Sequence, residues 1–205
     1  MFEDVQCPVL THSTMLSFLK GYSRPNDKIN SLIKAGHLIR LQRELYLVSD
    51  TKFFPKYLIA NQLLRPSYVS SYSALQEYVL ISESVEVITS VTVGRSKTVS
   101  TPVGTFDFHP VPQKYYGIGI QSVVREGLGF LIATKEKALC DLLVASRNNR
   151  IQSKSSMQTY LETFLRIDLE DLVDFDLELL HAIAKCGFKS KMITILAQTI
   201  EDYQC

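Results

Sequence analysis

Amide and basic side chains recur between residues 24 and 43 in a pattern suited to reading nucleic-acid bases. Pro25 fits the first position of a helix, and Ile29 and Leu32 predict its buried side, so the helix is expected to run to about Lys34 and to close at Gly36. Asparagine pairs with adenine, and lysine or arginine with guanine, in the major groove. The polar positions left on the other faces of this helix are Asn26, Lys28, Asn30, Ser31 and Lys34.

The elements around this helix complete a recognisable order. An earlier helix is expected after Thr11 or Ser13, ending at Gly21, and two strand-like runs, 37–41 and 44–48, follow as a basic hairpin. Helix, turn, helix and hairpin is the order of a winged helix-turn-helix, which we assign to residues 1–50. Any additional first helix would have to lie within Phe2–Val9.

Charge is distributed unevenly along the 205 residues, although the formal net charge is only +1. Residues 12–66 carry nine lysines and arginines against three acids, and residues 151–205 carry five against nine. A bound polyanion would therefore meet the N-terminal part. The alternative is a small helical subdomain whose charges only solvate it.

The rest of the chain predicts an α/β domain over residues 51–150 and a helical extension over 151–205, so the fold class is α+β. Residues 56–64 and a segment starting at Ser70 or Ser71 have helical periodicity. Alternating β-branched residues predict a mixed or antiparallel sheet. Its expected strands are Val85–Val93, Thr98–Thr101, Thr105–Val111, Tyr115–Ile120, Gln121–Arg125 and Phe130–Ala133.

The segment Gly129–Val144 is the expected structural centre of this domain. Its apolar run 130–133 is typical of a strand buried on both faces, and Thr134 is a helix N-cap candidate. Ala138, Leu139, Leu142 and Leu143 give the following helix a buried side. The polar residues expected at its rim are Lys135, Glu136, Lys137 and Asp141.

Several classes of protein do not fit the composition. Four widely spaced cysteines form no CxxC pair, which favours a reduced, cytoplasmic protein without structural zinc. Neither a signal pattern nor an apolar run of membrane-spanning length is present. Seven carboxylates between Glu162 and Glu178 lack the spacing of a calcium loop, so we expect no metal and no cofactor.

Five sequence segments, in order, resemble one family: the antitoxins and transcriptional regulators of bacterial AbiE abortive-infection systems. The segments are KAGHLIRLQRELYLV, PSYVSSYSALQEYVLI, EVITSVTVGRSKTVSTPVGTFDFHPV, YYGIG and IATKEKALCDLL. The resemblance implies a winged-helix DNA-binding domain and an α/β antitoxin domain in a phage-defence operon. It also implies repression of the chain's own promoter and neutralisation of a nucleotidyltransferase toxin without a stable complex.

By this resemblance, the recognition helix is Pro25–Lys34 and the wing is Leu38–Val48. Glu44 stands where the family often has glycine, and Lys135 where it commonly has proline. One short helix reads few bases, so a specific site needs two copies of the protein or repeated half-sites. The candidate contacts to double-stranded DNA are Arg24, Asn26, Lys28, Asn30, Lys34, Arg40 and Arg43.

Two other functions compete with this one. A metal-dependent nuclease would use Asp107 with Glu136 and Lys137, but those two are adjacent at a helix start rather than alternating on a strand, and His109 is expected to be structural. We therefore expect no enzymatic activity. The other alternative is a protein-interaction module that has lost DNA binding, with an acidic tail for a basic partner.

Overall fold

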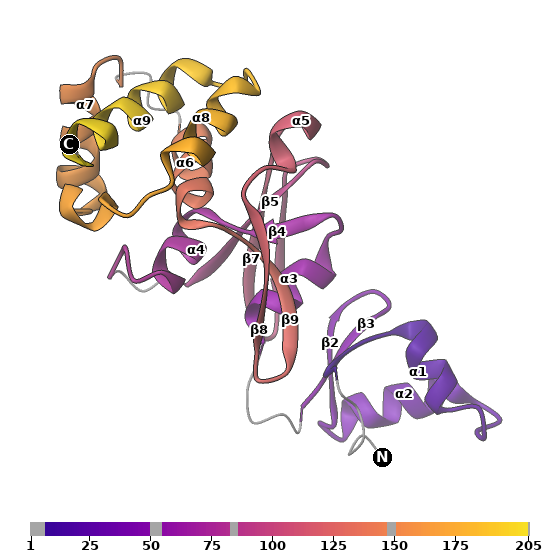
Figure 1. Cartoon of the computed structure of the whole chain (residues 1–205). Coiled ribbons are helices and arrows are strands. Elements are labelled where there is room, and N and C mark those ends of the chain that lie inside the picture. The colour runs from indigo at the N-terminus through magenta and orange to yellow at the C-terminus, as the bar shows by residue number, and fades with distance from the viewer. Residues whose placement is uncertain (1–6, 50–54, 83–85, 147–150, 205) are drawn as a thin grey trace.

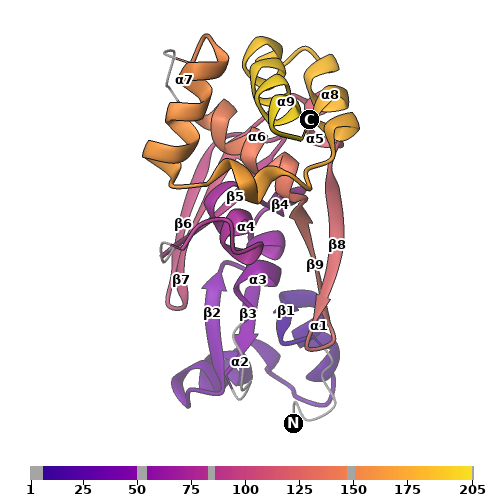
Figure 2. The ribbon, with the colours of Figure 1, turned by 60° about the vertical axis from the view of Figure 1, so that its left-hand side comes forward.

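The computed structural model describes residues 7–49, 55–82, 86–146 and 151–204 and has an α+β fold with a mixed sheet. It has three parts: an N-terminal unit (residues 9–48), a central six-stranded sheet with its helices, and a C-terminal helical lobe (residues 151–204). Figures 1 and 2 show the N-terminal unit and the helical lobe at opposite ends of the molecule, with the sheet between them.

The N-terminal unit combines two helices with a three-stranded antiparallel sheet in the order β1-β3-β2. The Thr11 hydroxyl caps the first helix by accepting a hydrogen bond from the amide of Thr14 at 3.2 Å. Both expected helices and the hairpin are confirmed. The elements are β1 (Val9–Thr11), α1 (His12–Phe18), α2 (Pro25–Lys34), β2 (Leu38–Gln42) and β3 (Leu45–Val48).

The range Phe2–Val9, left open for an additional first helix, is not helical at Val9, which belongs to β1, and residues 1–6 lie outside the described residues. The physical reason is the pairing of Val9 with Leu47, which places this segment in the sheet.

Strand β3 is covered on both faces. Leu45 and Leu47 point into the main hydrophobic core, whereas Tyr46 and Val48 point into a smaller core formed with α1 and α2. Because successive side chains of a strand point to opposite faces, one four-residue strand joins the two cores.

The central sheet has the strand order β6-β7-β5-β4-β9-β8. Strands β5 and β7 are parallel, β4 and β9 are parallel through one residue pair, and the remaining pairs are antiparallel. The strands are β4 (Ser67–Val69), β5 (Val87–Thr92), β6 (Lys97–Thr101), β7 (Gly104–Pro110), β8 (Ile120–Arg125) and β9 (Leu128–Ala133).

Sequence reasoning missed or misassigned two elements of this sheet. The sequence pattern predicts no strand at β4. The strand expected over Tyr115–Ile120 is wrong: residues 113–116 form the short helix α5 (Gln113–Tyr116), and a turn with Gly117 and Gly119 follows. The reason is that Tyr115 is fully buried against Phe188 and Lys137, where a helical turn directs it inward.

Helices surround the sheet and fill the lobe. Figure 2 shows η1, η2 and α7 to α9 gathered at one end, next to α6. The helices expected near residues 56–64, after Ser70, and through the tail are confirmed. The bounds are α3 (Lys56–Leu63), α4 (Ser71–Glu77), α6 (Lys135–Ala145), α7 (Lys154–Thr159), the π-helical η1 (Tyr160–Leu165), the 3₁₀ turn η2 (Leu169–Leu172), α8 (Leu177–Lys185) and α9 (Ser190–Gln204).

Helix α6 differs from its expected environment. Thr134 does cap it, since its hydroxyl accepts from the amide of Lys137. However, every residue from Glu136 to Val144 is buried, because α4 packs on one side of α6 and α8 and α9 pack on others. The expected rim position is therefore wrong for Glu136, Lys137 and Asp141. Strand β9 is the reverse case: Leu131 is 41% exposed, so β9 is not buried on both faces.

Candidate nucleic-acid interface

Helix α2 presents a polar stripe to solvent. Asn26, Asn30 and Lys34 are spaced four residues apart and are all exposed, whereas Ile29 and Leu32 are buried on the opposite side. Residues four apart are neighbours on a helix surface. The three side chains therefore form one line of hydrogen-bonding groups along the helix.

Arg40 on β2 joins this stripe. Its Nη2 donates a hydrogen bond to Oδ1 of Asn30 at 3.3 Å, and its guanidinium carbon lies 5.8 Å from the centroid of the Tyr46 ring. The aromatic face supports the cation. The helix and the hairpin therefore present their polar groups on a common surface.

Two of the predicted contacts lie toward the turn between α1 and α2. Arg24 forms an exposed ion pair with Asp27 at 3.9 Å, and the Nζ of Lys28 lies 5.4 Å from the centroid of the Tyr22 ring. Such exposed pairs are weak and easily exchanged. Both cations flank the beginning of α2 rather than the line from Asn26 to Lys34.

The turn between β2 and β3 contains the departure from glycine noted above. Glu44 has a φ of +65°, in the left-handed region that favours glycine. Its carbonyl accepts from the amide of His12 at 2.8 Å, and its carboxylate lies 3.7 Å from Nε of Arg43. The side chain of Arg43 is 94% exposed. Glu44 thus places a negative charge beside the almost fully exposed Arg43.

A buried ion pair lies within α6 and is hydrogen-bonded to residues of neighbouring elements. Nζ of Lys137 lies 3.0 Å from Oδ1 of Asp141, and both side chains are fully buried. The same ammonium donates to the carbonyl of Tyr115 at 3.1 Å and lies against the Tyr115 ring. Burial lowers the pKa of Lys137, and the Asp141 carboxylate acts in the opposite direction.

Strand β4 and the N-cap residue of α4 supply the other partners of this carboxylate. Oδ2 of Asp141 accepts from the hydroxyl of Tyr68 at 3.0 Å and from Oγ of Ser70 at 2.5 Å. Burial, followed by the nearby Asp141 charge, raises the pKa values of Tyr68 and Tyr115 far above the ordinary tyrosine value, so both phenols keep their protons. Sequence reasoning missed this network; its one local signal is that Lys137 and Asp141 lie four residues apart in a helix whose other residues from Ala138 to Val144 are apolar.

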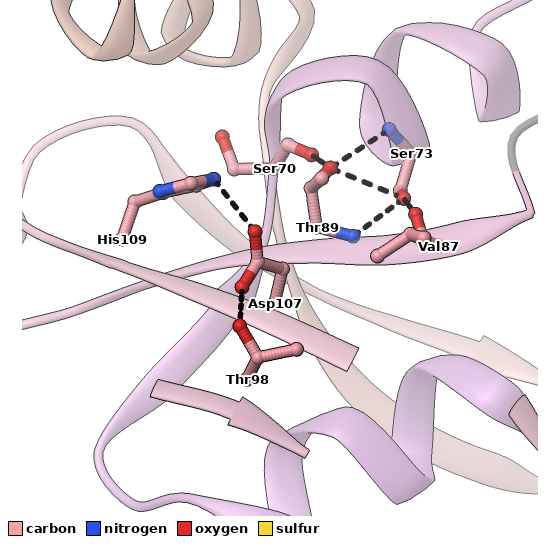
Figure 3. Close-up of polar contacts among 7 residues, drawn as sticks. All are labelled: Ser70, Ser73, Val87, Thr89, Thr98, Asp107 and His109. Atoms are coloured by element: carbon pink, nitrogen blue, oxygen red, sulfur yellow. Dashed lines mark hydrogen bonds and ion pairs between the residues drawn. The ribbon is translucent and has the colours of Figure 1, made fainter. Parts of the chain in front are cut away.

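A second polar cluster lies on β5, β6 and β7, the region considered for a nuclease. Figure 3 shows the Asp107 and His109 side chains directed toward each other, with Oδ2 and Nε2 3.6 Å apart. Thr98 donates to the other Asp107 oxygen at 2.6 Å. The nearby serine hydroxyls are engaged elsewhere: Ser70 with Asp141, and Ser73 with the amide of Thr89.

The other members of the nuclease hypothesis are not brought to this cluster. Oε1 of Glu136 accepts from the amide of Asp176, just before α8, and Lys137 is engaged in the ion pair described above. Among the described residues, no group of three or more histidine, cysteine or acidic side chains is arranged to hold a metal ion.

Within the described ranges, no helix combines the length and apolarity needed to cross a membrane. Comparisons of the chain with protein-family models and with curated proteins found no match.

Proposed function

We propose that this chain is a DNA-binding transcriptional regulator with an antitoxin domain, and that residues 9–48 act as a winged helix-turn-helix. The observation that carries the proposal is the hydrogen bond between Arg40 and Asn30, which joins the exposed stripe of α2 to the hairpin. In this assignment α2 enters the major groove, and the turn with Arg43 contacts phosphate.

The arrangement of the N-terminal unit supports this assignment in two further ways. Within the described residues 7–49, the order strand, helix, helix, strand, strand is that of the part of a winged helix that follows its first helix. The exposed stripe contains two asparagines, which suit adenine, and Lys34, which suits guanine or phosphate.

The test is a salt titration of binding to the duplex just upstream of the chain's own gene, beside a scrambled duplex. We expect roughly 4–6 phosphate contacts and a log–log salt slope of about −4 to −5. Asn30→Ala should abolish the preference for the upstream duplex, and Arg40→Ala should weaken binding to both duplexes. Arg95→Ala, an exposed arginine in the turn between β5 and β6, is the matched control. Equal binding of the wild type to both duplexes at every salt concentration contradicts the proposal.

Glu44 provides a second test, because it combines an unfavourable charge with an unfavourable conformation. Glu44→Gln removes the charge beside Arg43, and Glu44→Gly also relieves the positive φ. We expect both variants to bind DNA more tightly, by roughly 2- to 5-fold for one removed repulsion. Glu44→Gly alone should also raise the free energy of unfolding. Unchanged DNA affinity in both variants would mean that this turn does not approach the phosphates.

The antitoxin role rests on the family resemblance and has its own experiment. Co-expression with a nucleotidyltransferase encoded beside the gene should restore growth, and the full-length Arg40→Ala variant, which keeps the core intact, should retain that rescue if the α/β domain carries it. Loss of DNA binding without loss of rescue would separate the two activities. A chain that fails to rescue growth at any expression level would retain only the regulator role.

A further inference from the structure

Strand β8 forms one edge of the central sheet. It pairs with β9 over six consecutive residue pairs, from Ile120 with Ala133 to Arg125 with Leu128, without a bulge. A regular edge strand presents a row of backbone groups that can pair with another chain.

The two edges of the sheet differ in how they are protected. Strand β6, at the other edge, begins with the exposed Lys97 and lies beside β2 of the N-terminal unit. Strand β8 has the sequence IQSVVR, with no proline, no glycine and a single charge. That charge is compensated within the chain, because Arg125 donates to Glu77 at 2.7 Å. Edge lysines, prolines and bulges, which normally prevent pairing, are therefore missing from β8.

Apolar side chains are exposed beside this edge. Val124 is 66% exposed and Leu131, on β9, is 41% exposed. Ser122 is the pairing partner of Leu131 and Val124 is that of Gly129, so these residues share one face of the β8–β9 hairpin. The open edge and the exposed face therefore adjoin.

We propose that β8 pairs antiparallel with β8 of a second copy of this chain, which extends the six-stranded sheet across a twofold axis. The sequence of β8 is electrostatically compatible with itself. With the axis through Val123, Arg125 of one copy lies opposite Gln121 of the other, and Val124 lies opposite Ser122. This register places no two like charges opposite each other and brings Val124 of each copy next to the other's exposed face.

The pairing is independent of DNA binding, and its test uses the full chain without DNA. Sedimentation equilibrium of the wild type at rising concentration should show a mass approaching twice the 23.2 kDa of one chain. Val124→Lys removes the exposed apolar contact and places a lysine at each edge, which should weaken dimerisation by roughly 10-fold or more. Val173→Lys is the matched control, because Val173 is also an exposed valine but lies in the helical lobe.

Hydrogen exchange locates the contact. The backbone amides of residues 120–125 should exchange more slowly as the protein concentration rises, while those of β6 remain unchanged. A wild type that stays at 23.2 kDa, or a Val124→Lys variant that dimerises as well as the wild type, would overturn the proposal.

Discussion

Helices α2 and α4 end in the same hydrogen-bonded motif, but the residue with the left-handed backbone conformation is glycine in one and valine in the other. After α2, Gly36 has a φ of +79°, and the amide of His37 donates to the carbonyl of Leu32. After α4, the amide of Leu80 donates to Leu75 in the same way, but the left-handed position is occupied by Val79, with a φ of +60°. Both are Schellman motifs, which favour glycine at this position. A β-branched residue there is strained.

Val79→Gly should therefore stabilise the protein. The side chain is 87% exposed, so its removal loses little packing, and the relief of strain outweighs the greater freedom of glycine in the unfolded chain by about 1 kcal/mol. Urea unfolding followed by circular dichroism measures the change. Val87→Gly, at an exposed position of β5 with ordinary backbone geometry, should instead destabilise. A destabilised Val79→Gly variant would contradict this prediction. It would show that the valine side chain stabilises the fold by more than the cost of its strained backbone conformation.

At the scale of elements, α6 depends on a charge pair that water does not reach. Removing one member leaves the other charge buried without its partner, which costs about 3–5 kcal/mol. Asparagine at position 141 keeps an acceptor for Tyr68 and Ser70 while removing the charge. Substitution of Asp141 by asparagine therefore tests the charge pairing with Lys137 separately from the hydrogen bonds of Tyr68 and Ser70.

The prediction is that Lys137→Met/Asp141→Asn unfolds at a higher urea concentration than either single variant. The double variant has no charge at position 137 or 141, whereas each single variant keeps one buried charge without its partner. Lys154→Met, which breaks the exposed pair with Asp202, should cost less than about 1 kcal/mol. Additive effects of the two α6 substitutions would mean that the pair contributes nothing as a pair.

The elements that sequence reasoning recovered are those with strong local signals. Helix α2 has proline at its start and glycine after its end, and β5 alternates β-branched residues, so local chemistry was sufficient for both. The polar network was not recoverable in the same way, because Tyr68, Tyr115 and Asp141 are far apart in sequence and are brought together only by packing. Strand β4 has three residues, too few to show a period, and α5 was misassigned because tertiary burial of Tyr115 decides its conformation.

For the molecule as a whole, Leu47 is one of the residues by which the N-terminal unit packs into the main core. It is fully buried in the main core, while its neighbours Tyr46 and Val48 belong to the core of the N-terminal unit. Leu47→Ala should reduce the free energy of unfolding by about 2–5 kcal/mol. We expect hydrogen exchange to accelerate in both α2 and β5, because the two cores unfold together.

Met15→Ala is the contrasting variant, since Met15 lies only in the smaller core. It should accelerate exchange mainly in α1 and α2. Separate unfolding transitions for the two parts of Leu47→Ala, with β5 unaffected, would show that the N-terminal unit folds independently of the sheet.

The burial of β3 on both faces also determines how the helical lobe would be oriented on a DNA duplex. A swivel of the N-terminal unit about β3 would open Leu45 and Leu47 to water, so the unit has no low-cost hinge at this strand. Because α2 lies at one end of the molecule and the helical lobe at the other, the distance and orientation between them are then fixed. If α2 binds a duplex, the lobe would lie at a fixed distance and direction from the axis of the DNA. Moving the binding site by one base pair would therefore rotate the lobe around the DNA by about 34–36°, because the duplex has 10–10.5 base pairs per turn.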